Sequence, residues 1–140
     1  MDQQAVITDN ISEVLTKIIE FTNNRQKILA ENINNLHNFG FIPTDLAVNE
    51  FSDLLDAAID EHVRSRRLVL YDSQNVNFGP EGLFKTKPII DHAAKKLLDE
   101  NKDQYIEFQV NKLLENAINQ RLAAELLTQR QTINETFGQI

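Results

Sequence analysis

The stretch RQKILAENINNLHNFGF, Arg25–Phe41, contains the end of a predicted helix and the sharp turn that follows it. The predicted fold of the rest of the chain depends on this turn. Its second half is crowded with asparagine, at Asn32, Asn34, Asn35 and Asn38. Asparagine is a poor helix former, because its side chain competes for backbone hydrogen bonds. It tolerates the left-handed conformation better than most residues, and glycine permits a sharp reversal. We therefore expect a turn over 39–44 with Gly40 at positive φ.

Two further expectations concern the side chains of this turn. An asparagine amide can both donate to and accept from exposed backbone. We expect Asn32 or Asn35, which lie about a turn apart, to bond the backbone of the segment beyond the turn. We also expect Phe39 or Phe41 to pack back against the helix that it leaves, as hydrophobic residues after helix ends commonly do.

Long helical patterns flank the turn. An N-terminal helix is predicted over 10–38, with Asn10 as its cap and Glu13 completing a capping box. A C-terminal helical region is predicted over 88–137. Apolar residues recur every three or four positions in both, and those expected to pack the helices together are Ile11, Leu15, Ile18, Leu36, Val110, Leu114, Ile118, Leu122, Leu126 and Ile133. Isolated amphipathic helices are only marginally stable in water, so each must pack its apolar face against a partner. The pattern therefore predicts that the two helices form an antiparallel hairpin with a coiled-coil-like core.

The residues that interrupt helices, proline and glycine, are concentrated in the middle of the chain. All three prolines and three of the four glycines lie between residues 40 and 88. A shorter middle helix is predicted over 45–67, followed by a loop or short β-hairpin over 68–87. A further helix is expected to start near Pro88, and the pattern leaves open whether it continues unbroken into the last stretch. The sequence thus predicts a single, mostly all-α domain over 1–140.

Composition excludes several functions. The formal net charge of −7 argues against nucleic acid as a partner. No cysteine is present, so there are no disulfides, thiolate metal sites or thiol nucleophile. No apolar run approaches the roughly 20 residues that span a bilayer. The first ten residues carry acid where a signal peptide carries Lys or Arg, so we expect any export to proceed without a cleavable signal peptide.

Residues with catalytic potential are few. The histidines His37, His62 and His92 are scattered and lack metal-ligand spacing. Asp53, Asp56 and Asp60 share one helix face, where a solvated surface is a simpler explanation than a carboxylate site. We expect that the protein is not an enzyme and that it binds no cofactor, metal or small-molecule substrate. A helical-bundle enzyme using these three aspartates is the third and weakest reading.

The opening stretch is similar to the N-terminal signature of bacterial flagellar basal-body rod proteins, a helix reading Leu-Ala-x-Asn-Ile-x-Asn followed by a Gly-aromatic pair. The matching residues are Leu29, Ala30, Asn32, Ile33, Asn35, Gly40 and Phe41. The downstream FSDLLDAAI fits the Phe-x-x-x-Leu pattern of that family. The C-terminal stretch resembles that of the proximal rod subunits (FlgB-like), through Leu114, Glu115, Asn116, Leu126, Leu127 and Ile140.

The resemblance implies a structural role without catalysis. Members of the family pack their terminal helices together and stack helically into the periplasmic rod of the flagellar basal body, next to the membrane without spanning it. Their implied partners are copies of themselves and other rod or export-gate proteins, and they are secreted by the flagellar type III export apparatus. The alternative is a soluble helical adaptor or chaperone that binds a partner helix.

Overall fold

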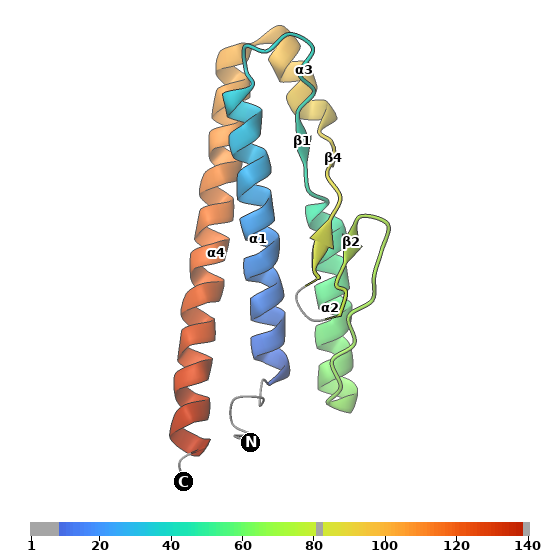
Figure 1. The fold of residues 1–140 in the computed structure, drawn as a ribbon, viewed down its shortest axis with the longest axis vertical. Helices are drawn as coiled ribbons and strands as arrows, with labels where there is room; N and C mark the ends of the chain where they lie inside the picture. The colour runs from blue at the N-terminus through green and yellow to red at the C-terminus, as the bar shows by residue number, and fades with distance from the viewer. Residues whose placement is uncertain (1–8, 81–82, 139–140) are drawn as a thin grey trace.

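The computed structural model describes residues 9–80 and 83–138, and it is mostly helical, as expected (Figure 1). Its helices are α1 (Asn10–Asn34), α2 (Val48–Ser65), α3 (His92–Glu100) and α4 (Lys102–Gly138). Short strands join them: β1 (Thr44–Asp45), β2 (Val76–Asn77), β3 (Lys85–Thr86) and β4 (Ile89–Ile90). β1 pairs antiparallel with β4, and β2 pairs antiparallel with β3.

The terminal helices α1 and α4 form a long antiparallel hairpin (Figure 1). α4 has 37 residues, which corresponds to roughly 55 Å at 1.5 Å per residue. The amide of Asn116 in α4 donates to the carbonyl of Thr22 in α1 at 2.8 Å. Near the open end, the Asn134 amide donates to the Asp9 carboxylate at 2.7 Å. Side-chain contacts therefore hold the two helices together along much of their length.

The hydrophobic core lies on the other side of α1, between α1, α2 and residues 68–80 and 83–87. Its centre is a stack of Phe21 from α1 on Phe51 from α2, with ring centroids 4.0 Å apart. Phe78 and Phe84 from the β2–β3 region pack beside Phe51 at 6.3 and 6.1 Å. The remaining buried members are Val14, Leu46, Leu55 and Val76. α1 thus packs against the hydrophobic core on this side and against α4 on the other.

The start of α1 differs from expectation. Asp9, not Asn10, is the N-cap, and its carboxylate accepts from the backbone N–H of Ser12 at 2.7 Å. Asn10 is the first helical residue, and its amide bonds Nδ1 of His62 at 2.8 Å across the gap to α2. A carboxylate is favoured at this position because it also meets the positive end of the helix dipole.

The turn after α1 follows the expected backbone. Gly40 has φ of 79°, which confirms the predicted left-handed conformation. α1 ends at Asn34 rather than near residue 38, and Asn35 is its C-cap, donating from its amide to the Glu31 carbonyl at 2.8 Å. Phe39 is fully exposed, so of the two phenylalanines expected to pack back against α1 it is not the one that does so. Phe41 is half-buried.

The middle segments begin and end differently from the pattern-based bounds. α2 starts at Val48 because Thr44 and Asp45 pair with β4 as a strand. Pro88 precedes β4, and α3 begins only at His92, where the Asp91 carboxylate caps it at 3.0 Å. Asn101 separates α3 from α4, which settles the question of continuity. No helix in the described ranges 9–80 and 83–138 is long and apolar enough to cross a membrane.

Candidate functional site

A buried polar node forms where α1, the strand β1 and α4 meet. The Asn32 amide donates to the Thr44 carbonyl at 2.7 Å, and its oxygen accepts from the Thr44 N–H at 3.2 Å. The same amide donates to Gln109 of α4 at 3.1 Å. The Tyr105 hydroxyl donates to the Asn32 backbone carbonyl at 2.8 Å. The expectation that an asparagine of this stretch bonds the backbone beyond the turn is therefore confirmed.

The node sits deep in the molecule. Asn32, Gln109 and Tyr105 are at most 1% exposed. Burial, together with the charge of Asp91, raises the pKa of Tyr105 to about 12, so the hydroxyl keeps its proton and remains a donor. Because buried polar groups are costly when unpaired, this arrangement admits few other side chains.

The other members of the proposed family motif have different environments. Leu29 is fully buried, one helical turn before Asn32. Ala30, Ile33 and Asn35 are half-buried at the end of α1. Together with Gly40 in the turn, the motif builds a specific helix exit in this chain, held by one inward asparagine and its leucine neighbour.

The face of α4 that meets α1 is not the expected one. Val110, Leu114, Ile118, Leu122, Leu126 and Ile133, which were expected to pack against the N-terminal helix, are all between 39% and 66% exposed. The buried residues of α4 are instead Tyr105, Gln109, Asn116 and Ala123. In α1, Leu15 is buried, while Ile11, Ile18 and Leu36 are half-buried. Leu122 and Leu126 still line the groove between α1 and α4, so the expectation is wrong for the more outward Val110, Leu114, Ile118 and Ile133.

The physical reason is that polar side chains of α4 hydrogen-bond to α1 at this interface. Amides from α4 bond backbone carbonyls or amides of α1, so a mostly polar stripe is buried and the apolar stripe turns outward. A sequence signal for it exists in the strict seven-residue spacing of Gln109, Asn116 and Ala123. Hydrophobicity alone overlooks this spacing, because two of its three members are amides.

The exposed apolar residues of α4 form a diagonal band. Val110, Leu114 and Ile118 follow one another at intervals of four, and we call these three the ridge. Each step of four advances about 40° around a helix of 3.6 residues per turn, so the band winds around α4. The exposed fractions of the side chains agree with this winding, because they rise from 39% at Val110 to 66% at Ile118 and fall to 40% at Leu126. The band thus crosses the outermost face of α4 and returns to the α1 side at Leu126.

Where the band returns, it borders an apolar groove between the two terminal helices. This hairpin groove has a volume of about 270 Å³. Leu15, Ile18 and Phe21 contribute from α1, and Leu122, Ala123 and Leu126 contribute from α4. The ridge and the hairpin groove are therefore separate features of the same hairpin.

A cluster of four charges joins the middle segment to the hairpin. The Asp45 carboxylate of β1 accepts from Arg25 of α1 at 2.9 and 3.0 Å and from Lys112 of α4 at 2.9 Å. Lys112 also contacts Asp91, the cap of α3, at 2.6 Å. Burial raises the pKa of Asp45, but the hydrogen bonds from Arg25 and Lys112 outweigh it, so the pKa lies below its ordinary value. These contacts tie α1, α4, β1 and the start of α3 together.

A second ionic contact closes the free ends of the hairpin. Asp9 caps α1 and also contacts Arg130 of α4 at 3.2 Å. Burial raises the pKa of Asp9, but hydrogen bonds from Asn134 and Ser12 and the charge of Arg130 lower it overall to about 2. The carboxylate therefore stays ionised at neutral pH and links the start of α1 to the end of α4.

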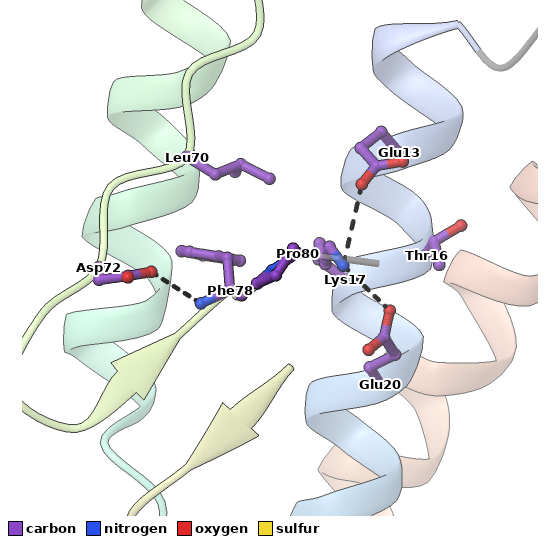
Figure 2. A pocket seen from close by; sticks show the side chains of 9 residues that line it. Glu13, Thr16, Lys17, Glu20, Leu70, Asp72, Phe78 and Pro80 are labelled. Carbon is purple, nitrogen blue, oxygen red and sulfur yellow. Dashed lines mark hydrogen bonds and ion pairs between the residues drawn. The ribbon is translucent and has the colours of Figure 1, made fainter. Parts of the chain in front are cut away.

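An open pocket of about 670 Å³ lies between the first half of α1 and the segment 70–80 (Figure 2). Lys17 is buried there, and its ammonium group lies 3.8 Å from Glu13 and 3.3 Å from Glu20. Asp72 accepts from the Phe78 N–H at 2.8 Å (Figure 2). The charged groups of this pocket are thus engaged, Lys17 with two carboxylates and Asp72 with a backbone N–H.

The carboxylates of α2 lie apart from these features. Asp53, Asp56 and Asp60 are exposed on the outer face of the helix. Within residues 9–80 and 83–138, no three His, Asp or Glu side chains gather in a metal-binding arrangement. His62 is half-buried, with its ring bonded to Asn10, whereas His37 and His92 are exposed.

Together, the hairpin, the polar interface and the outward apolar band define an elongated helical protein with an uncovered face on its C-terminal helix. No family model matches the chain, and neither a curated protein nor a solved structure shows significant similarity to it.

Proposed function

We propose that the chain is a structural subunit of the bacterial flagellar basal-body rod, of the FlgB-like proximal type. The observation that supports this most is the apolar band on α4, because a terminal helix with uncovered aliphatic side chains needs a partner. Ile133 and Phe137, at 48% and 69% exposure, extend the apolar surface towards the C-terminus. Larger exposed apolar patches commonly mark protein–protein contacts.

The dimensions of the molecule also support an assembled state. Its accessible surface is 9449 Å², against roughly 7400 Å² for a compact monomer of 16.1 kDa. An elongated hairpin leaves more area available for neighbours than a compact domain of the same mass. In this proposal the partners are further copies of the chain and other rod or export-gate proteins, and the location is the periplasmic rod.

The proposed role requires a stiff hairpin. The Asn32 node, the Asp45 cluster and the Asp9 contact hold α1 and α4 at both ends and in the middle. Specific polar contacts of this kind favour one register between two helices over its alternatives. A subunit that transmits torque benefits from a single register.

The test is to delete the gene in a flagellated source organism and image basal bodies. Loss of the rod, restored by the wild-type gene, is the expected result. Complementation with Leu114→Asp, which places a charge on the exposed band, should fail to restore the rod. Asp53→Asn on the outer face of α2 is the matched control and should complement fully. Intact rods in the deletion strain would refute the proposal.

A soluble helical adaptor or chaperone is the second candidate, and the hairpin groove favours it, since partner helices dock their apolar faces into such grooves. Sedimentation of the purified chain separates the two. An adaptor remains a monomer or closed dimer at all concentrations, whereas a rod subunit grows into larger species as concentration rises.

A further inference from the structure

We infer that Asn10 and His62 form a pH-sensitive latch, which holds the end of α2 against the start of α1 while the histidine ring is neutral and releases it when the ring takes up a proton. The amide nitrogen of Asn10 lies 2.8 Å from Nδ1 of His62 and donates to the backbone carbonyl of Arg66 at 3.2 Å. The latch belongs to the single chain and does not depend on the proposed role in the rod.

The carbonyl of Arg66 fixes which way round the Asn10 amide lies. A carbonyl oxygen can only accept, so the group that faces it is the NH₂ of Asn10 and not its oxygen. An amide NH₂ carries two hydrogens, and the second is free to be donated to Nδ1 of His62. Nδ1 must then accept, so it carries no proton. The closed latch therefore selects the neutral ring, with its hydrogen on Nε2.

Protonation of the ring removes this acceptor. Both nitrogens of an imidazolium ring are donors, so Nδ1 of His62 would face the NH₂ of Asn10 donor to donor. Turning the amide round would offer its oxygen to the ring, but would set that oxygen against the Arg66 carbonyl. Histidine is the side chain whose charge ordinarily changes between pH 5 and 8. Because the closed latch binds only the neutral ring, a fall in pH through this range favours the open form.

The backbone at Arg66 supplies independent support for a switch at this place. Its φ is 63°, and over residues 9–80 and 83–138 it is the only residue other than glycine with a positive φ. This conformation is unfavourable for a residue with a Cβ atom. Strained conformations persist where surrounding contacts hold them, and they are common in switch regions. Release of the Asn10 bond would thus let the last turn of α2 relax.

Charged groups around the ring act in both directions. Glu61 and the negative end of the α2 dipole attract a proton to His62, whereas the neighbouring arginines repel it. The charged residues on the elements that meet here are Asp9, Glu13 and Lys17 from α1 and its cap, Glu61, Arg64 and Arg66 from the end of α2, Arg67 and Asp72 from the segment that follows, and Arg130 from α4. Many of them are paired, Asp9 with Arg130, Glu13 with Lys17 and Glu61 with Arg64. The Asn10 amide remains the contact that distinguishes the two forms of the ring.

The latch should open without opening the hairpin. Asp9, the residue before Asn10, ties the start of α1 to Asn134 of α4, and its pKa of about 2 keeps it ionised across the histidine range. Mild acid therefore frees the end of α2 alone. The segment after α2 carries Leu68 and Leu70, which pack against the hydrophobic core. Release of the latch would loosen this edge of the core.

Hydrogen exchange of the full-length chain, followed by mass spectrometry, tests the latch. The protection of each segment is compared at pH 7.5 and pH 5.5, after correction for the intrinsic exchange rate at each pH, at a concentration where the chain sediments as a single copy. We expect residues 60–70 to lose protection by about fivefold or more at the lower pH, while residues 105–125 of α4 keep theirs. Unchanged protection of residues 60–70 would overturn the inference.

Three substitutions separate the latch from a general effect of acid. His62→Asn keeps a side-chain acceptor near the position of Nδ1 and does not titrate, so residues 60–70 should be equally protected at both pH values. Asn10→Asp replaces the donor by a carboxylate that accepts from the protonated ring, so protection should rise on acidification. His37→Asn, at an exposed histidine in the turn, is the matched control and should behave like the wild type. A loss of protection that persists in either latch variant would also overturn the inference.

Discussion

Asn32 and Thr44 pair through two hydrogen bonds, 2.7 and 3.2 Å long, although twelve positions separate them in the chain. The side chain of Asn32 imitates a neighbouring strand, because its amide offers the donor and acceptor that a backbone peptide offers. α1 therefore controls the path of the chain after the turn. Of the asparagines in this ending, Asn32 makes tertiary contacts, whereas the amides of Asn35 and Asn38 bond within the ending itself.

Asn32→Ala tests this role. It removes both bonds to Thr44 and the bond to Gln109, leaving buried groups unpaired, so we expect a loss of about 2–3 kcal/mol in the free energy of unfolding. Urea unfolding measures it. Asn34→Ala, an exposed neighbour at the helix end, should stay within about 0.5 kcal/mol of the wild type. Equal effects of the two substitutions would argue against a special role of Asn32.

Gly40 provides a test of backbone strain. Its φ is 79°, and an added Cβ would meet nothing within 4 Å, so any cost reports conformation rather than a clash. We expect Gly40→Val to lower stability by about 1–2 kcal/mol. Gly40→Asn should cost less, because asparagine tolerates this region. A thermal unfolding series that ranks the two substitutions equally would contradict the explanation.

Asp9 should give the hairpin a distinctive acid sensitivity. Its pKa is about 2 in the folded chain, below the ordinary value of 3.8, so the folded state binds this proton less readily than the unfolded state. The stabilisation is therefore present above pH 4 and is lost as the pH falls through 2, by roughly 1–2 kcal/mol. Asp9→Asn should lack this loss. Unfolding free energies at pH 5, 3 and 2 for both proteins make the comparison; parallel curves would count against the prediction.

The Asp45 cluster should be sensitive to loss of its anion. Asp45→Asn leaves Arg25 and Lys112 with less compensation in a largely buried site, and we expect a loss of about 3–5 kcal/mol. Asp53→Asn, on the exposed face of α2, should change stability by less than about 0.5 kcal/mol. Urea midpoints of the two variants decide, and a small effect at Asp45 would mean that the cluster relaxes around the amide.

Leu29 and Leu126 separate folding from assembly. Leu29 is 0% exposed and Leu126 is 40% exposed. Leu29→Asp buries an unpaired charge and should cost about 4 kcal/mol or more, enough to unfold a marginal domain. Leu126→Asp should cost about 1 kcal/mol or less. Circular dichroism with urea titration measures both, and similar losses would mean that the hairpin groove is part of the folding core.

Local chemistry was readable from the sequence. The helix positions follow from apolar spacing and from the placement of prolines and glycines, and the left-handed turn follows from Gly40 among asparagines. The reach of Asn32 to the backbone beyond the turn was also predictable, because it depends on a short, local loop. Helix bounds were less accurate, since β1 and β4 take residues that propensity alone assigns to α2 and α3.

The sequence did not predict which face of α4 packs against α1 and which remains exposed. The apolar residues of α4 satisfy a helix pattern on either side of the helix, and hydrophobicity alone assigns them to the interior. Which side is buried depends on hydrogen bonds between residues far apart in the chain, such as Asn116 with Thr22 and Tyr105 with Asn32. These bonds exist only once α1 and α4 lie side by side. The turn was thus encoded locally, whereas the uncovered ridge is a consequence of long-range polar pairing.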